Sequence, residues 1–280
     1  DTTRLLEKEG IDIAIIPVNK EGVIDLEKLK EEINNQTVLV SVMYVNNELA
    51  TIQPIKEIAE IIKDYKSENN SSYPLFHSDA VQAFQLIDCN VEELGVDLMT
   101  ISAHKIYGPK GIGALYVKSL DTLSPIITGG GQEFNLRSGT QNTPSIIGFG
   151  KAVEMTLELR DKERKRLQEL SSYFWKEVKS NFPKAQLNGP AVDSSVRLPH
   201  ILNISFPGNK SEEMLIKLDM AGVAVSTGSA CSARSIKESH VLQAINLPYN
   251  IRNSSLRFSF GRPTIKEQVE ELVEILKKTI

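Results

Sequence analysis

The chain has 280 residues with 41% hydrophobic and 24% charged residues, a composition typical of an ordinary globular protein. Lysine and arginine number 32 against 36 aspartates and glutamates, and the net charge of −4 excludes a general attraction to nucleic-acid phosphates or an anionic membrane. The longest apolar stretches, such as Val38–Val45, are too short to cross a bilayer. Two cysteines are too few for a secreted disulfide framework, so we expect a reducing compartment, the cytoplasm.

The first half of the chain alternates strand-like and helix-like segments. Ile11–Val18 is β-branched and predicts a strand, and Asp25 is a candidate N-cap for the helix that follows it. Thr37–Val45 is almost continuously apolar, as in a strand buried on both faces, and precedes a helix over Ile55–Tyr65 and a polar loop over Lys66–Tyr73. Further strands are expected at Leu75–Ser78, Asp97–Ser102 and Gly113–Val117. This alternation predicts the α/β class with a mostly parallel sheet.

The second half of the chain has a different pattern of predicted elements. Thr143 and Pro144 begin a helix that runs past Lys179, and its charge run at residues 160–166 is typical of a solvated helix face rather than a nucleic-acid patch. A last helix should open at Thr264 with a capping box to Glu267. Shorter elements are expected at Leu202–Phe206, Ser211–Met220, Val223–Ser226 and Ser255–Phe260. We predict a large domain over residues 1–160 and a smaller α+β domain over residues 161–280.

Polar side chains follow three of the expected strands. Ser102, His104 and Lys105 stand at the end of one strand, before a glycine-rich turn. Open α/β sheets bind ligands at this edge, where a lysine amine can attack a carbonyl carbon. A surface lysine in a turn is the other interpretation of Lys105. Asp79 ends another strand and is either an N-cap or a partner for a protonated ring nitrogen, while Asn47 is either a turn former or a hydrogen-bond donor.

The two cysteines differ in their surroundings. Cys89 lies between the strand-like Leu86–Ile87 and the polar Asn90 and is interpreted as structural, whereas Cys231 lies among small residues in Ser226–Ala233. This context predicts an exposed loop suited to a nucleophilic thiolate. Metal ligation with His240 is the weaker interpretation, because no second cysteine or histidine cluster completes a site.

Two further segments carry polar groups. Three successive glycines from Gly129 lead into hydroxyl residues up to Thr140, without the Gly-Lys-Ser/Thr sequence of a Walker loop. Arg257 lies in a strand-like segment, where its guanidinium is either a carboxylate-binding fork or part of a surface ion pair.

Taken in order, these segments resemble one family over the whole chain. The motifs are VNNE at Val45–Glu48, HSDAVQ at His77–Gln82, SAHKIYGPKGIGALYV at Ser102–Val117, GGGQE and RSGT within Gly129–Thr140, STGSAC at Ser226–Cys231 and LRFSFGR at Leu256–Arg262. They are similar to those of cysteine desulfurases of the NifS/IscS type, class-V enzymes that use pyridoxal 5'-phosphate (PLP). The resemblance implies a fold-type-I PLP transferase large domain and a small C-terminal domain that carries the cysteine loop.

The resemblance also implies roles for single residues. Lys105 matches the lysine that binds PLP covalently, Asp79 the partner of the pyridine nitrogen, and Arg257 the residue that binds the substrate carboxylate. Cys231 matches the sulfur-accepting nucleophile. Positions near the cofactor hydroxyl or phosphate are matched by Asn47, Gln82, Ser102, His104 and Thr140, the last reaching across a homodimer interface.

The implied reaction converts L-cysteine to L-alanine and leaves a persulfide on Cys231 for a sulfur acceptor, such as an iron–sulfur cluster assembly or scaffold protein. The family extends upstream of Asp1, so we expect an N-terminal portion to be missing, with a phosphate-binding segment and a histidine that stacks on the ring. Alternatives are another class-V enzyme, such as an aminotransferase or selenocysteine lyase, and a catalytically silent fragment or scaffold.

Overall fold

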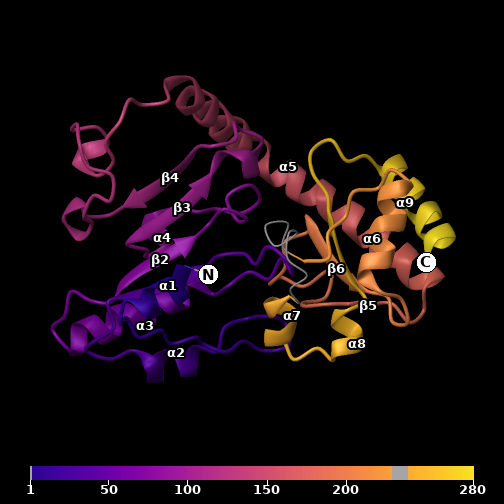
Figure 1. Cartoon of the computed structure of the whole chain (residues 1–280), viewed down its shortest axis with the longest axis horizontal. Coiled ribbons are helices and arrows are strands. Elements are labelled where there is room, and N and C mark those ends of the chain that lie inside the picture. Colours follow the sequence, from indigo (N-terminus) through magenta and orange to yellow (C-terminus); the bar gives the residue numbers. More distant parts are fainter. Residues whose placement is uncertain (1, 229–238) are drawn as a thin grey trace.

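The computed structural model describes residues 2–228 and 239–280. Two sheets, one on each side of Figure 1, are joined by the long helix α5 (Thr143–Asn181). The first sheet has the order β1-β2-β3-β4 and contains β1 (Leu39–Met43), β2 (Leu75–Asp79), β3 (Leu98–Ser102) and β4 (Gly113–Val117). β1, β2 and β3 are parallel and β4 is antiparallel to β3, which confirms the predicted α/β class with a mostly parallel sheet.

One face of this sheet packs on helices. The preceding and connecting helices are α1 (Thr2–Lys8), α2 (Leu26–Glu32), α3 (Ile55–Glu68) and α4 (Val91–Leu94). The apolar side of α3 buries Ile55, Ile58 and Ile62 in the same hydrophobic cluster as Phe76 and Met99 of the sheet. The opposite face carries His77 and Asp79 of β2, both only partly buried. The sheet is therefore covered on one side by α3, and the other side carries the polar side chains at the end of β2.

After β4 the chain forms the short 3-10 helices η2 (Leu120–Thr122) and η3 (Glu133–Asn135), and then enters α5. Asn142 caps α5, because its side chain accepts a hydrogen bond from Ser145 N. The helix predicted from Thr143 to beyond Lys179 is thus confirmed. Since α5 runs without a break through residue 160, the domain boundary there stays a prediction.

The second sheet has the order β5-β6-β7, with β5 (Gln186–Leu187), β6 (Ile201–Ser205) and β7 (Ser255–Ser259) all antiparallel to their neighbours. Its helices are α6 (Ser211–Met220), α7 (His240–Ala244), α8 (Tyr249–Arg252) and α9 (Lys266–Thr279). All five residues of β6 are buried. One hydrophobic cluster includes Phe76 of the first sheet, Phe174 of α5 and Phe258 of the second sheet. The two sheets therefore share a continuous core.

Several expected elements differ in the structure. Ile11–Val18 forms only an isolated bridge from Val18 to Ile24, and Ile15 is 86% exposed, because β-branched residues form a strand only where neighbours pair and pack. β1 is not buried on both faces, since Leu39 and Ser41 are exposed. In the short element expected at Val223–Ser226, only Ser226 forms an isolated bridge.

The ends of two helices also shift. The helix predicted over Ile55–Tyr65 continues to Glu68, which shortens the expected polar loop. The predicted capping box between Thr264 and Glu267 is wrong: α9 begins at Lys266, and the Gln268 side chain accepts a hydrogen bond from Ile265 N. The Thr264 hydroxyl instead accepts a hydrogen bond from Gly261 N at 3.0 Å. Thr264 therefore belongs to the turn before α9 and does not cap the helix.

In the described part of the chain, no helix is long and apolar enough to span a bilayer.

Candidate active site

The carboxyl ends of β2 and β3 bring most of the predicted site residues to one edge of the first sheet. Asp79 pairs in register with Thr100. The end of β2 therefore lies beside the last residues of β3, which ends at Ser102. Asp79 accepts a hydrogen bond from Val81 N at 2.9 Å, which orients its carboxylate at the start of the following turn. Parallel strands thus place the carboxylate next to the segment that carries Lys105.

The lysine segment is the 3-10 helix η1 (Ala103–Ile106). Ala103 and Ile106 are buried against Phe149 and Ala152 of α5, whereas His104 and Lys105 are exposed. The alternation of small apolar and polar residues therefore anchors the turn on α5 and leaves the lysine amine accessible. His104 Nδ1 lies 2.8 Å from Ser102 Oγ, so these two predicted phosphate-binding groups are side by side.

Glycine is required where this segment turns back. A Cβ at Gly108 would lie 3.0 Å from Ala103 O and 3.1 Å from the Ala152 Cβ. Gly108 N donates to Ala103 O at 2.8 Å, which closes the turn. The absence of a side chain thus lets the lysine turn pack directly on α5.

Arg257 reaches the site from the second sheet. It is half-buried in β7, and its Nη1 donates to Asn47 O at 2.9 Å. The backbone of Arg257 also pairs with Ser226, with Ser226 N donating to Arg257 O at 3.2 Å. Arg257 and Asn47 are therefore brought together from opposite parts of the chain.

Gln82 is held by a residue that the sequence did not single out. Gln82 Oε1 lies 3.1 Å from Nε2 of His200, which is buried at the start of β6. Burial, followed by the positive charges of Arg197, Arg257 and Lys105, lowers the pKa of His200 to about 3, so the imidazole is neutral. The only sequence signal was a histidine directly before an apolar strand, which has no characteristic spacing to other site residues.

Cys231 and Thr140 are the remaining predicted residues. Cys231 lies outside the described residues. Thr140 is exposed in the segment before α5. Its predicted role across a dimer interface stays a prediction.

Glu48 and Ser239 form a second contact that sequence reasoning missed. Glu48 is 2% exposed and accepts a hydrogen bond from Ser239 Oγ at 2.6 Å. Ser239 also caps α7 by accepting from Leu242 N. Ser226 and Ser239, which precede and follow Cys231 in the sequence, are thereby attached to Arg257 and to the neighbour of Asn47.

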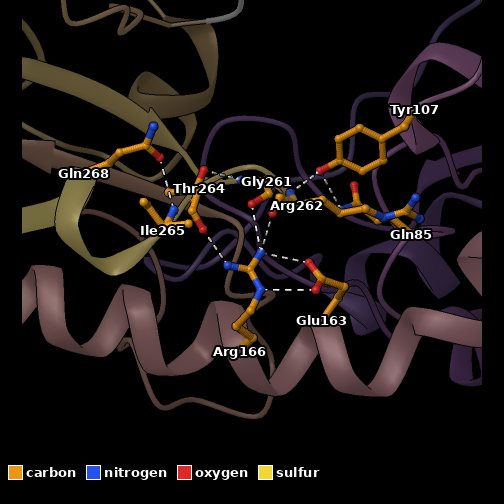
Figure 2. Close-up of polar contacts among 9 residues, drawn as sticks. All are labelled: Gln85, Tyr107, Glu163, Arg166, Gly261, Arg262, Thr264, Ile265 and Gln268. Atoms are coloured by element: carbon orange, nitrogen blue, oxygen red, sulfur yellow. Dashed lines mark hydrogen bonds and ion pairs between the residues drawn. The ribbon is translucent and has the colours of Figure 1, made fainter.

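A polar latch joins the lysine turn to the second sheet (Figure 2). The Tyr107 hydroxyl accepts hydrogen bonds from Arg262 N at 2.7 Å and Gln85 Nε2 at 3.4 Å. Arg166 of α5 pairs with Glu163 at 2.8 Å and donates to the carbonyl oxygens of Gly261 and Thr264. We call Tyr107, Glu163, Arg166 and residues 261–264 the latch. It connects the turn after Lys105 with the turn after β7.

Comparisons with known proteins show the family of the chain. The family described as Aminotransferase class-V matches residues 2–272. The cysteine desulfurase IscS of Dictyoglomus turgidum is 46% identical over 275 residues, covering 98% of this chain and 67% of that protein. The cysteine desulfurase IscS of Clostridium botulinum strain Hall is 43% identical over 279 residues, covering 100% of this chain and 68% of that protein.

Solved structures give the same result. A NifS-like protein superposes with a TM-score of 0.88 at 32% identity, covering 99% of this chain and 70% of that chain. The NifS-like protein from Rickettsia africae superposes with a TM-score of 0.86 at 31% identity, covering 99% of this chain and 72% of that chain. The predicted resemblance is therefore confirmed, and the chain belongs to the class-V aminotransferase family, among its cysteine desulfurases.

Proposed function

We propose that this protein is a PLP-dependent cysteine desulfurase that converts L-cysteine to L-alanine. The observation that carries the proposal is the grouping of Asp79, Ser102, His104 and Lys105 at one sheet edge, with Arg257 extending toward it from the second sheet. A family match alone would not place these groups together, because they come from segments far apart in the sequence.

The residues at this edge fit PLP by their chemistry. The exposed Lys105 amine would hold the cofactor through its aldehyde carbon. The Ser102 hydroxyl and the His104 imidazole, 2.8 Å apart, would bind its phosphate. The Asp79 carboxylate would keep a proton on its ring nitrogen. When bound, PLP supplies a ring that withdraws electrons from the substrate α-carbon.

The chain's own residues then account for the remaining steps. Arg257 binds the α-carboxylate of L-cysteine, for which the planar guanidinium fork is suited. The thiolate of Cys231 attacks the substrate sulfur, so that an S–S bond forms as the C–S bond breaks. The substrate carbon gains a proton and leaves as alanine, and Cys231 keeps the sulfur as a persulfide.

The physiological setting is part of the same proposal. The persulfide would be passed to a protein acceptor, and iron–sulfur cluster assembly is the use we propose. We also propose a cytoplasmic homodimer in which Thr140 contributes to the partner's phosphate site. Its exposure before α5 leaves it accessible to a second subunit.

Two variants test the function in the purified protein supplied with PLP. Lys105→Ala should abolish the visible absorption of covalently held PLP. Cys231→Ser should keep that absorption and lose alanine release from L-cysteine, while Cys89→Ser, at the buried cysteine, serves as the matched control. Full turnover by Cys231→Ser would contradict the role of Cys231. Pyruvate formation from an amino donor, without persulfide, would favour an aminotransferase.

A further inference from the structure

His200 connects the second sheet to the edge of the first sheet at which β2 and β3 end. It lies directly before β6 and is 7% exposed, and its backbone oxygen accepts a hydrogen bond from Phe260 N at 2.9 Å. Its Nε2 lies 3.1 Å from Oε1 of Gln82, 118 positions away in the sequence. The ring is therefore fixed from the second sheet and contacts a side chain that follows β2.

The surroundings of His200 decide which ring nitrogen carries the proton. Nδ1 is buried and has no hydrogen-bond partner among the described residues. A proton on Nδ1 would leave a buried N–H donor unpaired, which is rarer in folded proteins than an unpaired acceptor. A proton on Nε2 leaves only a lone pair unpaired, and that N–H donates to Gln82 Oε1.

A doubly protonated ring does not fit the same site. The guanidinium groups of Arg197 and Arg257 and the ammonium group of Lys105 lie near enough to oppose a further positive charge. Burial acts in the same direction and lowers the pKa of His200 to about 3. The imidazole is therefore a fixed, neutral Nε2–H donor.

This donor determines how the amide of Gln82 is turned. An amide has one acceptor end and one donor end, and its oxygen is engaged by His200. We propose that His200 is a positioning residue that orients the Gln82 amide, so that its N–H group faces the cofactor as a donor to an oxygen atom. The inference rests on the proposed function, in which Gln82 lies beside the ring hydroxyl of PLP.

The first test compares variants of the full chain by titration with PLP. His200→Leu removes the donor, frees the Gln82 amide to rotate, and should weaken PLP binding by about three- to tenfold, the value of one hydrogen bond. It should also shift the visible absorption of bound PLP. His200→Gln keeps an N–H donor and should bind PLP within about twofold of the wild type. His240→Leu, at an exposed histidine, is the matched control.

A second measurement does not need the cofactor. In protein labelled with 15N-histidine, the His200 signal should show the Nε2-protonated tautomer and should not titrate between about pH 5 and pH 8. The Nδ1-protonated form, or a titrating signal, would overturn the proposal even if His200→Leu does not fold.

The outcomes separate the two proposals. If the wild type binds PLP and His200→Leu has the same affinity and spectrum, the positioning role is wrong and the function stands. If the wild type does not bind PLP at all, both are wrong. A loss in His200→Leu that His200→Gln restores supports the role of His200.

Discussion

At the scale of single residues, Cys89 shows how burial makes a thiol unreactive. It is 8% exposed, and its Sγ lies 3.6 Å from Ile87 O. Burial raises the pKa of Cys89 from 9.0 to about 12, so the thiolate needed for nucleophilic attack does not form near neutral pH. The interpretation of Cys89 as a structural cysteine is therefore confirmed, and the nucleophilic role of Cys231 stays a proposal.

The same burial predicts an alkaline loss of stability. Above about pH 9 the unfolded chain loses the Cys89 proton while the folded chain keeps it until about pH 12. The free energy of unfolding should therefore fall by up to about 1.4 kcal/mol per pH unit across this window. Cys89→Ala should flatten that slope, measured by urea denaturation at several pH values, and an unchanged slope would contradict the assignment.

At the scale of secondary-structure elements, the latch fixes the turn between β7 and α9 on α5 (Figure 2). Arg166 Nη1 donates to Thr264 O at 2.6 Å, and Nη2 donates to Gly261 O at 2.9 Å. Its pairing with Glu163 uses both carboxylate oxygens, at 3.1 and 2.8 Å. Such a planar, bidentate arrangement suits arginine and would not be reproduced by lysine.

Arg166→Met should therefore lower the free energy of unfolding by about 2 kcal/mol, since hydrogen bonds to a charged group are lost and carbonyl oxygens remain without their donor. Arg164→Met, at an exposed position of the same helix, should change it by less than about 0.5 kcal/mol. Chemical denaturation of both variants gives the comparison. An equal loss of unfolding free energy in both variants would show that the latch contributes no more to stability than an exposed arginine of the same helix.

At the scale of the whole molecule, one core connects the two sheets. Phe174 of α5 is fully buried, and its ring centroid lies 5.0 Å from that of Phe258 and 5.5 Å from that of Phe260. These rings belong to the same cluster as Phe76 of the first sheet. We therefore expect both sheets to unfold in one cooperative transition.

Phe174→Ala should remove about 3–5 kcal/mol of stability, because it deletes a large buried ring and leaves a cavity. Phe134→Ala is the matched control, since Phe134 is 77% exposed.

For the unaltered protein, thermal unfolding followed by circular dichroism and by tryptophan fluorescence should give coincident transitions. Separate transitions for the two probes would show that the sheets unfold independently.

Patterns within one segment were predicted well. The period of apolar residues in α3 and the Thr-Pro start of α5 are local features, and both helices form as expected. The prediction at Ile11–Val18 was wrong because a strand needs a partner, and only Val18 finds a bridge. The helix start at Thr264 was wrong because Gly261, outside the capping pattern, uses that hydroxyl.

The sequence by itself determined the family and the α/β class, because each depends on residue types in a fixed order. Only the tertiary structure placed Arg257 on Asn47 and His200 on Gln82, contacts that span 210 and 118 positions. Such contacts depend on how two sheets pack around a shared core, and no local pattern encodes that packing. The proton position on His200 follows from burial and nearby cations, which likewise exist only in the folded chain.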